Sequence, residues 1–176
     1  VRVRAAGLNR ADLAVVQGTY VTSAGAPVRP FVGGAELAGE VVALGPGVER
    51  WTVGDRVMGQ GPGYAPLAAV DERLLLPVPD ALSWEEAGAL PVALLTMHDA
   101  LVTNGAALAG EQVLVHAVTS GVGVVGARIA VHLGAGRDLP AAARQDFRGG
   151  AQSRSRVGPY SGRGDVGAIL AIGARV

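Results

Sequence analysis

Apolar and polar residues alternate in short runs over the first 80 residues of the chain. The alternation starts at once, with valine and alanine at positions 1, 3 and 5 and arginine at positions 2 and 4. Successive side chains of a strand point to opposite faces, so this period predicts strands rather than helices. The expected strands are residues 1–8, 39–44, 56–59, 64–70 and 74–78. Glycine and proline turns separate them, and the region is predicted to be a small barrel or sandwich.

The pattern changes at Ser83. Ser83 and Glu86 have the spacing of a capping box, in which the serine caps the helix start and the glutamate reaches back. Pro91 would interrupt a continuous helix but suits a first helical position. Two helices are therefore predicted, at residues 84–90 and 91–102.

A glycine-rich turn follows the next apolar run. Residues 112–118 are apolar and predict a strand, and apolar positions at helical spacing predict a helix over 121–133. Between them lies Gly121-Val122-Gly123-Val124-Val125-Gly126, a GxGxxG pattern. Its first glycine permits a tight turn, its second lets the backbone approach a pyrophosphate, and its third lets helix and strand pack closely. Strand, glycine turn and helix together indicate a dinucleotide-binding loop.

The regular pattern ends after Ala135. Residues 136–176 are rich in arginine and glycine and show no sustained period before 166–172, so no packed element is predicted for most of them. The residue that would distinguish NADH from NADPH falls in this stretch. An RNA-binding interpretation of the arginines at 148–156 is disfavoured, because only Phe147 and Tyr160 are aromatic there.

Composition excludes several kinds of chemistry. The formal net charge is zero, which argues against a nucleic-acid binder. The chain has no cysteine, so disulfides, thiolate nucleophiles and cysteine-ligated zinc are excluded. All its basic residues other than histidine are arginine, which rules out lysine Schiff bases. No apolar run reaches the roughly 18 residues that a membrane span needs, and the expected location is the cytoplasm.

Five segments in a fixed order resemble a known family. The similarity is to the zinc-independent quinone oxidoreductase (zeta-crystallin-like) and enoyl reductase branch of the medium-chain dehydrogenase/reductase superfamily. The segments are GLNRAD (7–12), GTY (18–20), and residues 30–59, 74–96 and 113–135.

The resemblance implies an α/β fold with a β-barrel. A GroES-like catalytic domain is expected over residues 1–82, and its first strand is expected upstream of Val1. Inter-domain helices and the first strand-helix unit of a Rossmann NAD(P)-binding domain are expected over 83–135. The irregular tail, 136–176, does not match the family, whose next strand should follow Ala135 directly, so the chain looks truncated or frame-altered there.

Zinc is not expected. Gly34-Ala35-Glu36 stands where zinc alcohol dehydrogenases of the superfamily have Gly-His-Glu, so a histidine ligand is missing. A catalytic zinc needs three protein ligands. The three histidines, His98, His116 and His132, are interpreted as structural or surface residues, and no metal ligand is predicted.

The resemblance also implies site residues. Asn9 and Tyr20 are expected to line the substrate pocket near the nicotinamide and to be catalytic. The expected cofactor-binding residues are Thr96 at the nicotinamide end, Ser120, Gly121, Val122 and Gly123 at the pyrophosphate, and Gly126 in the fingerprint. Without the resemblance, Asn9 could equally be a turn residue and Tyr20 a packing group. Asp12 is interpreted as a helix-start residue rather than a catalytic acid.

The expected reaction is hydride transfer from NADPH, with NADH not excluded, to a quinone or an α,β-unsaturated carbonyl compound. Without a metal, hydrogen-bond donors must stabilise the charge that develops on the substrate oxygen. The expected partners are this small molecule and, in the family, a second copy in a homodimer, with neither nucleic acid nor membrane. The alternative is a catalytically inactive remnant or a protein-interaction fragment of such an enzyme.

Overall fold

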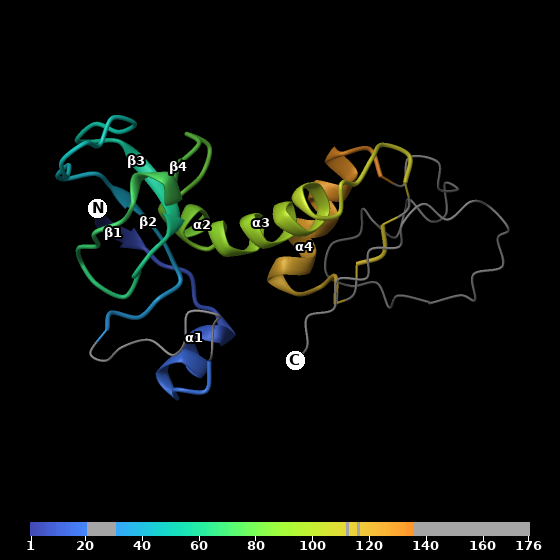
Figure 1. Cartoon of the computed structure of the whole chain (residues 1–176), viewed down its shortest axis with the longest axis horizontal. Coiled ribbons are helices and arrows are strands. Elements are labelled where there is room, and N and C mark those ends of the chain that lie inside the picture. The colour runs from blue at the N-terminus through green and yellow to red at the C-terminus, as the bar shows by residue number, and fades with distance from the viewer. Residues whose placement is uncertain (21–30, 112, 116, 136–176) are drawn as a thin grey trace, which may run out of the picture. The chain divides into compact units, whose positions relative to one another are not determined.

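A computed structural model gives the fold (Figure 1). It describes residues 1–20, 31–111, 113–115 and 117–135. The chain divides into two compact units, Val1–Val92 and Ala93–Val176, which are treated separately below.

The first unit contains a four-stranded antiparallel sheet in the order β1-β2-β3-β4. Its strands are β1 (Arg2–Ala5), β2 (Glu36–Glu40), β3 (Arg56–Gln60) and β4 (Leu75–Pro77). Four of the five predicted strands thus have counterparts, although the strand predicted at 39–44 begins three residues earlier. The described residues do not show the predicted closure into a barrel.

The strand predicted at 64–70 is wrong. Only Leu67 pairs, in an isolated bridge with Arg2. Val3 N–H donates to the Pro66 carbonyl at 3.0 Å, and Ala68 N–H donates to the Val1 carbonyl at 2.9 Å. The ladder cannot extend further at this point because Pro66 has no N–H to donate.

Helix α2 (Trp84–Gly88) covers one face of this sheet (Figure 1). The predicted capping box is confirmed: Ser83 Oγ accepts from Glu86 N–H at 3.2 Å, and Glu86 Oε2 accepts from Ser83 N–H at 2.9 Å. Ala38 and Met58 of the sheet and Ala87 of the helix are buried together. Local capping and this apolar contact fix the helix on the sheet.

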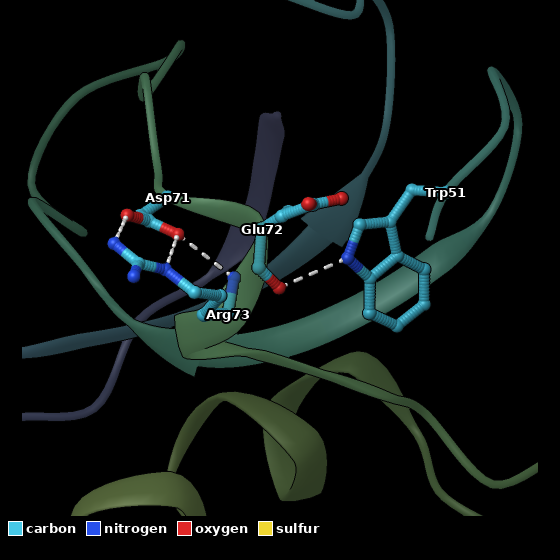
Figure 2. Close-up of polar contacts among 4 residues, drawn as sticks. All are labelled: Trp51, Asp71, Glu72 and Arg73. Atoms are coloured by element: carbon cyan, nitrogen blue, oxygen red, sulfur yellow. Dashed lines mark hydrogen bonds and ion pairs between the residues drawn. The ribbon is translucent and has the colours of Figure 1, made fainter. Parts of the chain in front are cut away.

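The short 3-10 turn η1 (Glu72–Leu74) ties a second loop to the sheet (Figure 2). The Glu72 carbonyl accepts a hydrogen bond from Trp51 Nε1 at 3.1 Å. Asp71 caps the turn by accepting from Arg73 N–H at 2.9 Å, and the Arg73 side chain holds the pKa of Asp71 below its ordinary value. Trp51 packs beside the buried residues Val57 and Leu75. These contacts cover Val57 and Leu75, which belong to a different apolar cluster from the one under α2.

The second unit is helical in its described part. Helix α3 (Pro91–His98), within which the division between the units falls, continues into a π-helical turn, η2 (Asp99–Thr103). Helix α4 (Gly121–His132) confirms the helix predicted at 121–133. The core of this unit contains Met97, Leu101, Ala130 and Ala135.

The strand predicted at 112–118 is wrong for the residues of that segment that the structure describes. Val115 forms an isolated bridge, and residues 117–119 are a turn. Ala117 has φ of 55°, in the left-handed region that L-residues rarely adopt, and this ends extended backbone before the glycine loop. In residues 113–115 and 117–135, the described part of the predicted Rossmann unit, the structure contains the helix and the turn before it but no strand. Among the described ranges, no helix combines the length and apolar character that a bilayer crossing demands.

Candidate functional site

Asn9 precedes a helix that the strand pattern did not predict. Helix α1 covers Arg10–Val16, and Asn9 is its N-cap, with extended backbone. Asp12, in the first turn, accepts a hydrogen bond from Asn9 N–H at 2.9 Å, and Asp12 N–H donates to the Asn9 carbonyl at 3.0 Å. The interpretation of Asp12 as a helix-start residue is confirmed. The half-buried Asn9 side chain remains available for other contacts.

Glu36, at the start of β2, receives the Asn9 side chain. Its side chain is buried, with 3% of the residue exposed. Oε1 accepts from Asn9 Nδ2 at 2.8 Å, and Oε2 accepts from Val92 N–H, in the first turn of α3, at 2.8 Å. Gly7 leaves room for the carboxylate, because a Cβ built at Gly7 would overlap it. Two hydrogen bonds, one to a helix N-terminus, offset the cost of burying this charge.

Tyr64 completes a group of polar side chains that we call the Asn9 network: Asn9, Asp12, Glu36 and Tyr64. Tyr64 Oη donates to Asp12 Oδ2 at 2.6 Å. The same Asp12 oxygen holds Asn9 N–H, so a single carboxylate connects the tyrosine to the start of α1. Tyr64 remains 43% exposed, so this side of the network faces solvent.

The hydrogen bond to Asp12 raises the pKa of Tyr64 from 10.0 to about 12. Because the folded pKa lies above the unfolded one, the contribution of Tyr64 to stability is fully present below pH 10.0 and is lost as the pH rises towards about 12. We expect Asp12→Asn to move the Tyr64 pKa back towards 10.0, since the amide carries no charge to oppose the phenolate. Ultraviolet titration, with Tyr64→Phe to identify this tyrosine, measures the change; an unaltered titration would contradict the assignment.

Tyr20 is not part of this network. Its side chain is 42% exposed, and its backbone N–H donates to the Ala14 carbonyl at 3.1 Å, just beyond α1. In the part of the chain that the structure describes, no hydrogen bond joins Tyr20 to Asn9. Asn9 therefore lies at the N-terminus of α1 and Tyr20 follows its C-terminus, and within the described residues the structure does not connect them by a hydrogen bond.

The expected pyrophosphate residues lie at the start of α4. Ser120 is the N-cap, and its Oγ accepts from Gly123 N–H at 3.0 Å. Ser120 N–H donates to the Ala117 carbonyl at 2.9 Å, which closes the turn. Gly123 is buried, and a Cβ built there would collide with the Ala117 carbonyl. The lack of a side chain at Gly123 therefore serves packing against the turn.

The open end of α4 is at Gly121 and Val122. A Cβ built at Gly121 would meet no other atom within 4 Å. In the first turn of a helix these N–H groups have no intrahelical acceptor, and the dipole favours an anion there. These two residues and the cap therefore fit a pyrophosphate. The third glycine, Gly126, packs on the Met97 side chain of α3 rather than on a strand.

Thr96 lies on α3 and is exposed, next to the buried Met97. All the expected cofactor residues thus belong to the second unit, and the expected substrate residues Asn9 and Tyr20 belong to the first.

No metal centre is visible in the portion of the chain that the structure describes, where no three histidine, aspartate or glutamate side chains gather. Both oxygens of Glu36 are already engaged by Asn9 and Val92. His116 lies outside the described residues.

Comparison with known proteins identifies the fold family. Residues 1–80 match the alcohol dehydrogenase GroES-like domain. The structure resembles a quinone oxidoreductase of Pseudomonas syringae pv. Tomato DC3000, with a TM-score of 0.63, 37% identity and coverage of 77% of this chain and 41% of that one. It also resembles the CurK enoyl reductase, with a TM-score of 0.64, 30% identity and coverage of 77% and 43%. The chain belongs to the medium-chain dehydrogenase/reductase superfamily.

The relatives that this chain matches are longer than the chain itself. Polyketide synthase GfsB of Streptomyces halstedii is 42% identical over 136 residues, which are 77% of this chain and 2% of that protein. Erythronolide synthase EryA2 of Saccharopolyspora erythraea is 41% identical over 136 residues, 77% of this chain and 4% of that protein. A mycobacterial structure complexed with NADPH has a TM-score of 0.66 and 35% identity, over 77% of this chain and 42% of that one. The chain thus spans half or less of the solved relatives and a small part of the polyketide synthases.

Proposed function

We propose that this chain is part of an NADPH-dependent reductase that delivers hydride, without a metal, to the β-carbon of an α,β-unsaturated carbonyl compound. The observation that carries the proposal is the start of α4. There the backbone at Gly121 borders open space beside the Ser120 cap, in a chain whose relatives include an enoyl reductase, quinone oxidoreductases and an NADPH complex.

The enoyl substrate of the proposal rests on the polyketide synthases, which are 41–42% identical to this chain. Among the solved structures the order is reversed, with 37% identity to the quinone oxidoreductase of Pseudomonas syringae and 30% to the CurK enoyl reductase. Reduction of a conjugated double bond moves negative charge to the distant carbonyl oxygen, where hydrogen-bond donors stabilise it. Asn9 and Tyr20 supply such donors in the first unit.

NADPH, when bound, supplies the hydride. Ser120, Gly121 and Val122 hold its pyrophosphate at the N-terminus of α4, and Thr96 contacts the nicotinamide end. Glu36 is occupied by Asn9 and Val92 and takes no part as a metal ligand. The residues of this chain therefore bind the cofactor and polarise the substrate carbonyl, and the hydride comes from the cofactor.

A chimera tests the proposal. Residues 1–135 of this chain are joined to the part of the CurK enoyl reductase that follows its matching segment. We expect the chimera to oxidise NADPH in the presence of a crotonyl thioester and more slowly with benzoquinone. No acceptor-dependent oxidation with either compound would contradict the function.

In this chimera, Asn9→Ala and Tyr20→Phe are each expected to slow reduction by about 10²-fold, the usual cost of removing one donor to a developing oxyanion. Binding of NADPH should change little, because neither residue belongs to the cofactor loop. Steady-state kinetics and NADPH fluorescence titration measure the two effects. Asn104→Ala is the matched control, because the Asn104 amide also donates to a carboxylate, Asp99 Oδ2, at 2.8 Å. Unchanged turnover in both variants would remove Asn9 and Tyr20 from the site.

A further inference from the structure

The proposed hydride transfer assigns no role to Glu36, the last residue of Gly34-Ala35-Glu36. Its carboxylate is buried, and it joins two segments that are distant in sequence. Asn9 donates to it from 27 residues before, and Val92 donates to it from 56 residues after. Gly7 lies two residues before Asn9. Only glycine leaves room for the carboxylate at this position, because a Cβ would overlap it.

We propose that Glu36 is a positioning residue that holds the Asn9 carboxamide in one orientation and ties it to the first turn of α3. The assignment rests on the proposed function only in placing Asn9 at the substrate.

The chemistry of the carboxylate fixes the orientation. An ionised carboxylate only accepts hydrogen bonds, so the amide edge that faces it must be the NH₂ group and not the carbonyl oxygen. The 2.8 Å distance between Asn9 Nδ2 and Glu36 Oε1 fits a charge-assisted hydrogen bond. Asn9 thereby keeps its second N–H and Oδ1 on the side away from Glu36. A carboxamide that is free to turn over would offer a donor and an acceptor there in alternation.

Val92 sets the position of the carboxylate itself. Its N–H belongs to the first turn of α3, where no intrahelical acceptor exists, and it donates to Glu36 Oε2 at 2.8 Å. A buried charge with both oxygens engaged has little rotational freedom. The Glu36 side chain therefore connects the start of α3 to the start of α1. A displacement of either helix end would move the Asn9 carboxamide.

A swap of the two side-chain types in the 176-residue chain tests the proposal. Asn9→Asp places a second carboxylate against the buried one of Glu36, and we expect the melting temperature to fall by about 5 °C or more. Glu36→Gln keeps an oxygen for Val92 N–H but turns an NH₂ group towards Asn9. The double variant N9D/E36Q restores one donor and one acceptor, and should recover at least half of the loss. A double variant that melts no higher than Asn9→Asp would overturn the proposal.

Side-chain amide resonances separate positioning from a purely structural role. In the unaltered chain, one Asn9 amide proton should be shifted by the carboxylate, with Asn9→Ala identifying the signal. Glu36→Gln should move both Asn9 protons, because the amide turns over. If Glu36 only capped α3, these signals would stay in place, and that result would overturn the proposal.

Turnover of the chimera distinguishes this proposal from the proposed function. Coupling in the swap, together with unchanged turnover of Asn9→Ala, would leave Glu36 as the residue that positions Asn9 and would refute the assignment of Asn9 to the substrate pocket. If the double variant N9D/E36Q recovers no stability but Asn9→Ala slows turnover, Asn9 stays in the substrate pocket and the positioning role of Glu36 is refuted.

Discussion

Gly123→Val is expected to weaken NADPH binding by the chimera by about 5- to 150-fold. Gly123 lies in the first turn of α4, buried against the turn that precedes it. A Cβ at this position would collide with the Ala117 carbonyl and would also lie 2.7 Å from Val118 Cα. Both contacts are with backbone, which cannot move aside as a flexible side chain can.

The collision acts through the Ser120 cap. Gly123 N–H donates to Ser120 Oγ, and Ser120 N–H donates to the Ala117 carbonyl. A valine that pushes Ala117 away therefore breaks the turn that places the open N–H groups of Gly121 and Val122. Overpacking costs about 1–3 kcal/mol, which corresponds to a loss of about 5- to 150-fold in affinity if it falls on the binding-competent loop. Fluorescence titration of NADPH measures it.

Gly121→Ala is the matched control, because a Cβ there meets nothing within 4 Å. It should leave the melting temperature of the chimera unchanged, and any loss of affinity would then report a clash with the ligand itself. Retained affinity in Gly123→Val would show that this loop does not hold the pyrophosphate.

The sequence was sufficient where the interaction is local. Ser83 and Glu86 are three residues apart, and the capping box that their spacing predicts is present at 2.9 and 3.2 Å. Apolar spacing also predicted α4 to within one residue of its end. In both places the residues that determine the structure lie within one or two turns of each other.

The Asn9 network could not be predicted in the same way. Tyr64 meets Asp12 across 52 residues, and Val92 meets Glu36 across 56. No local period encodes such pairs. One signal was available: Glu36 is a charged residue between apolar neighbours, and a charge at a core position requires partners. The partners themselves required the fold.

Two predicted strands failed for backbone reasons. At 64–70 the apolar residues suit a strand, but Pro66 has no N–H to donate. At 112–118 an apolar run ends in the left-handed conformation of Ala117. Apolar runs alone do not distinguish a strand from an extended loop whose side chains are half-buried.

The 176-residue chain is expected to bind NADPH much more weakly than the chimera. A doubly wound sheet places the glycine loop at the end of a strand that has parallel neighbours, and these form the walls of the nucleotide site. In the segment 113–115 and 117–118, which the structure describes, only Val115 pairs, through an isolated bridge. The sequence after Ala135 reads Gly136-Arg137-Asp138-Leu139-Pro140, which has no apolar run from which a neighbouring strand would form.

A thermal shift with NADPH measures this difference. A ligand at 100 times its dissociation constant stabilises the folded state by about 2.7 kcal/mol, which raises the melting temperature of a domain of this size by several degrees. We expect such a rise for the chimera and less than about 1 °C for the 176-residue chain at the same concentration. By itself, the start of α4 offers the two N–H groups of Gly121 and Val122 and a helix dipole, which are too little to hold a whole dinucleotide. A saturable rise in the 176-residue chain, accompanied by NADPH oxidation that depends on the crotonyl thioester, would instead show that residues 136–176 complete the cofactor site.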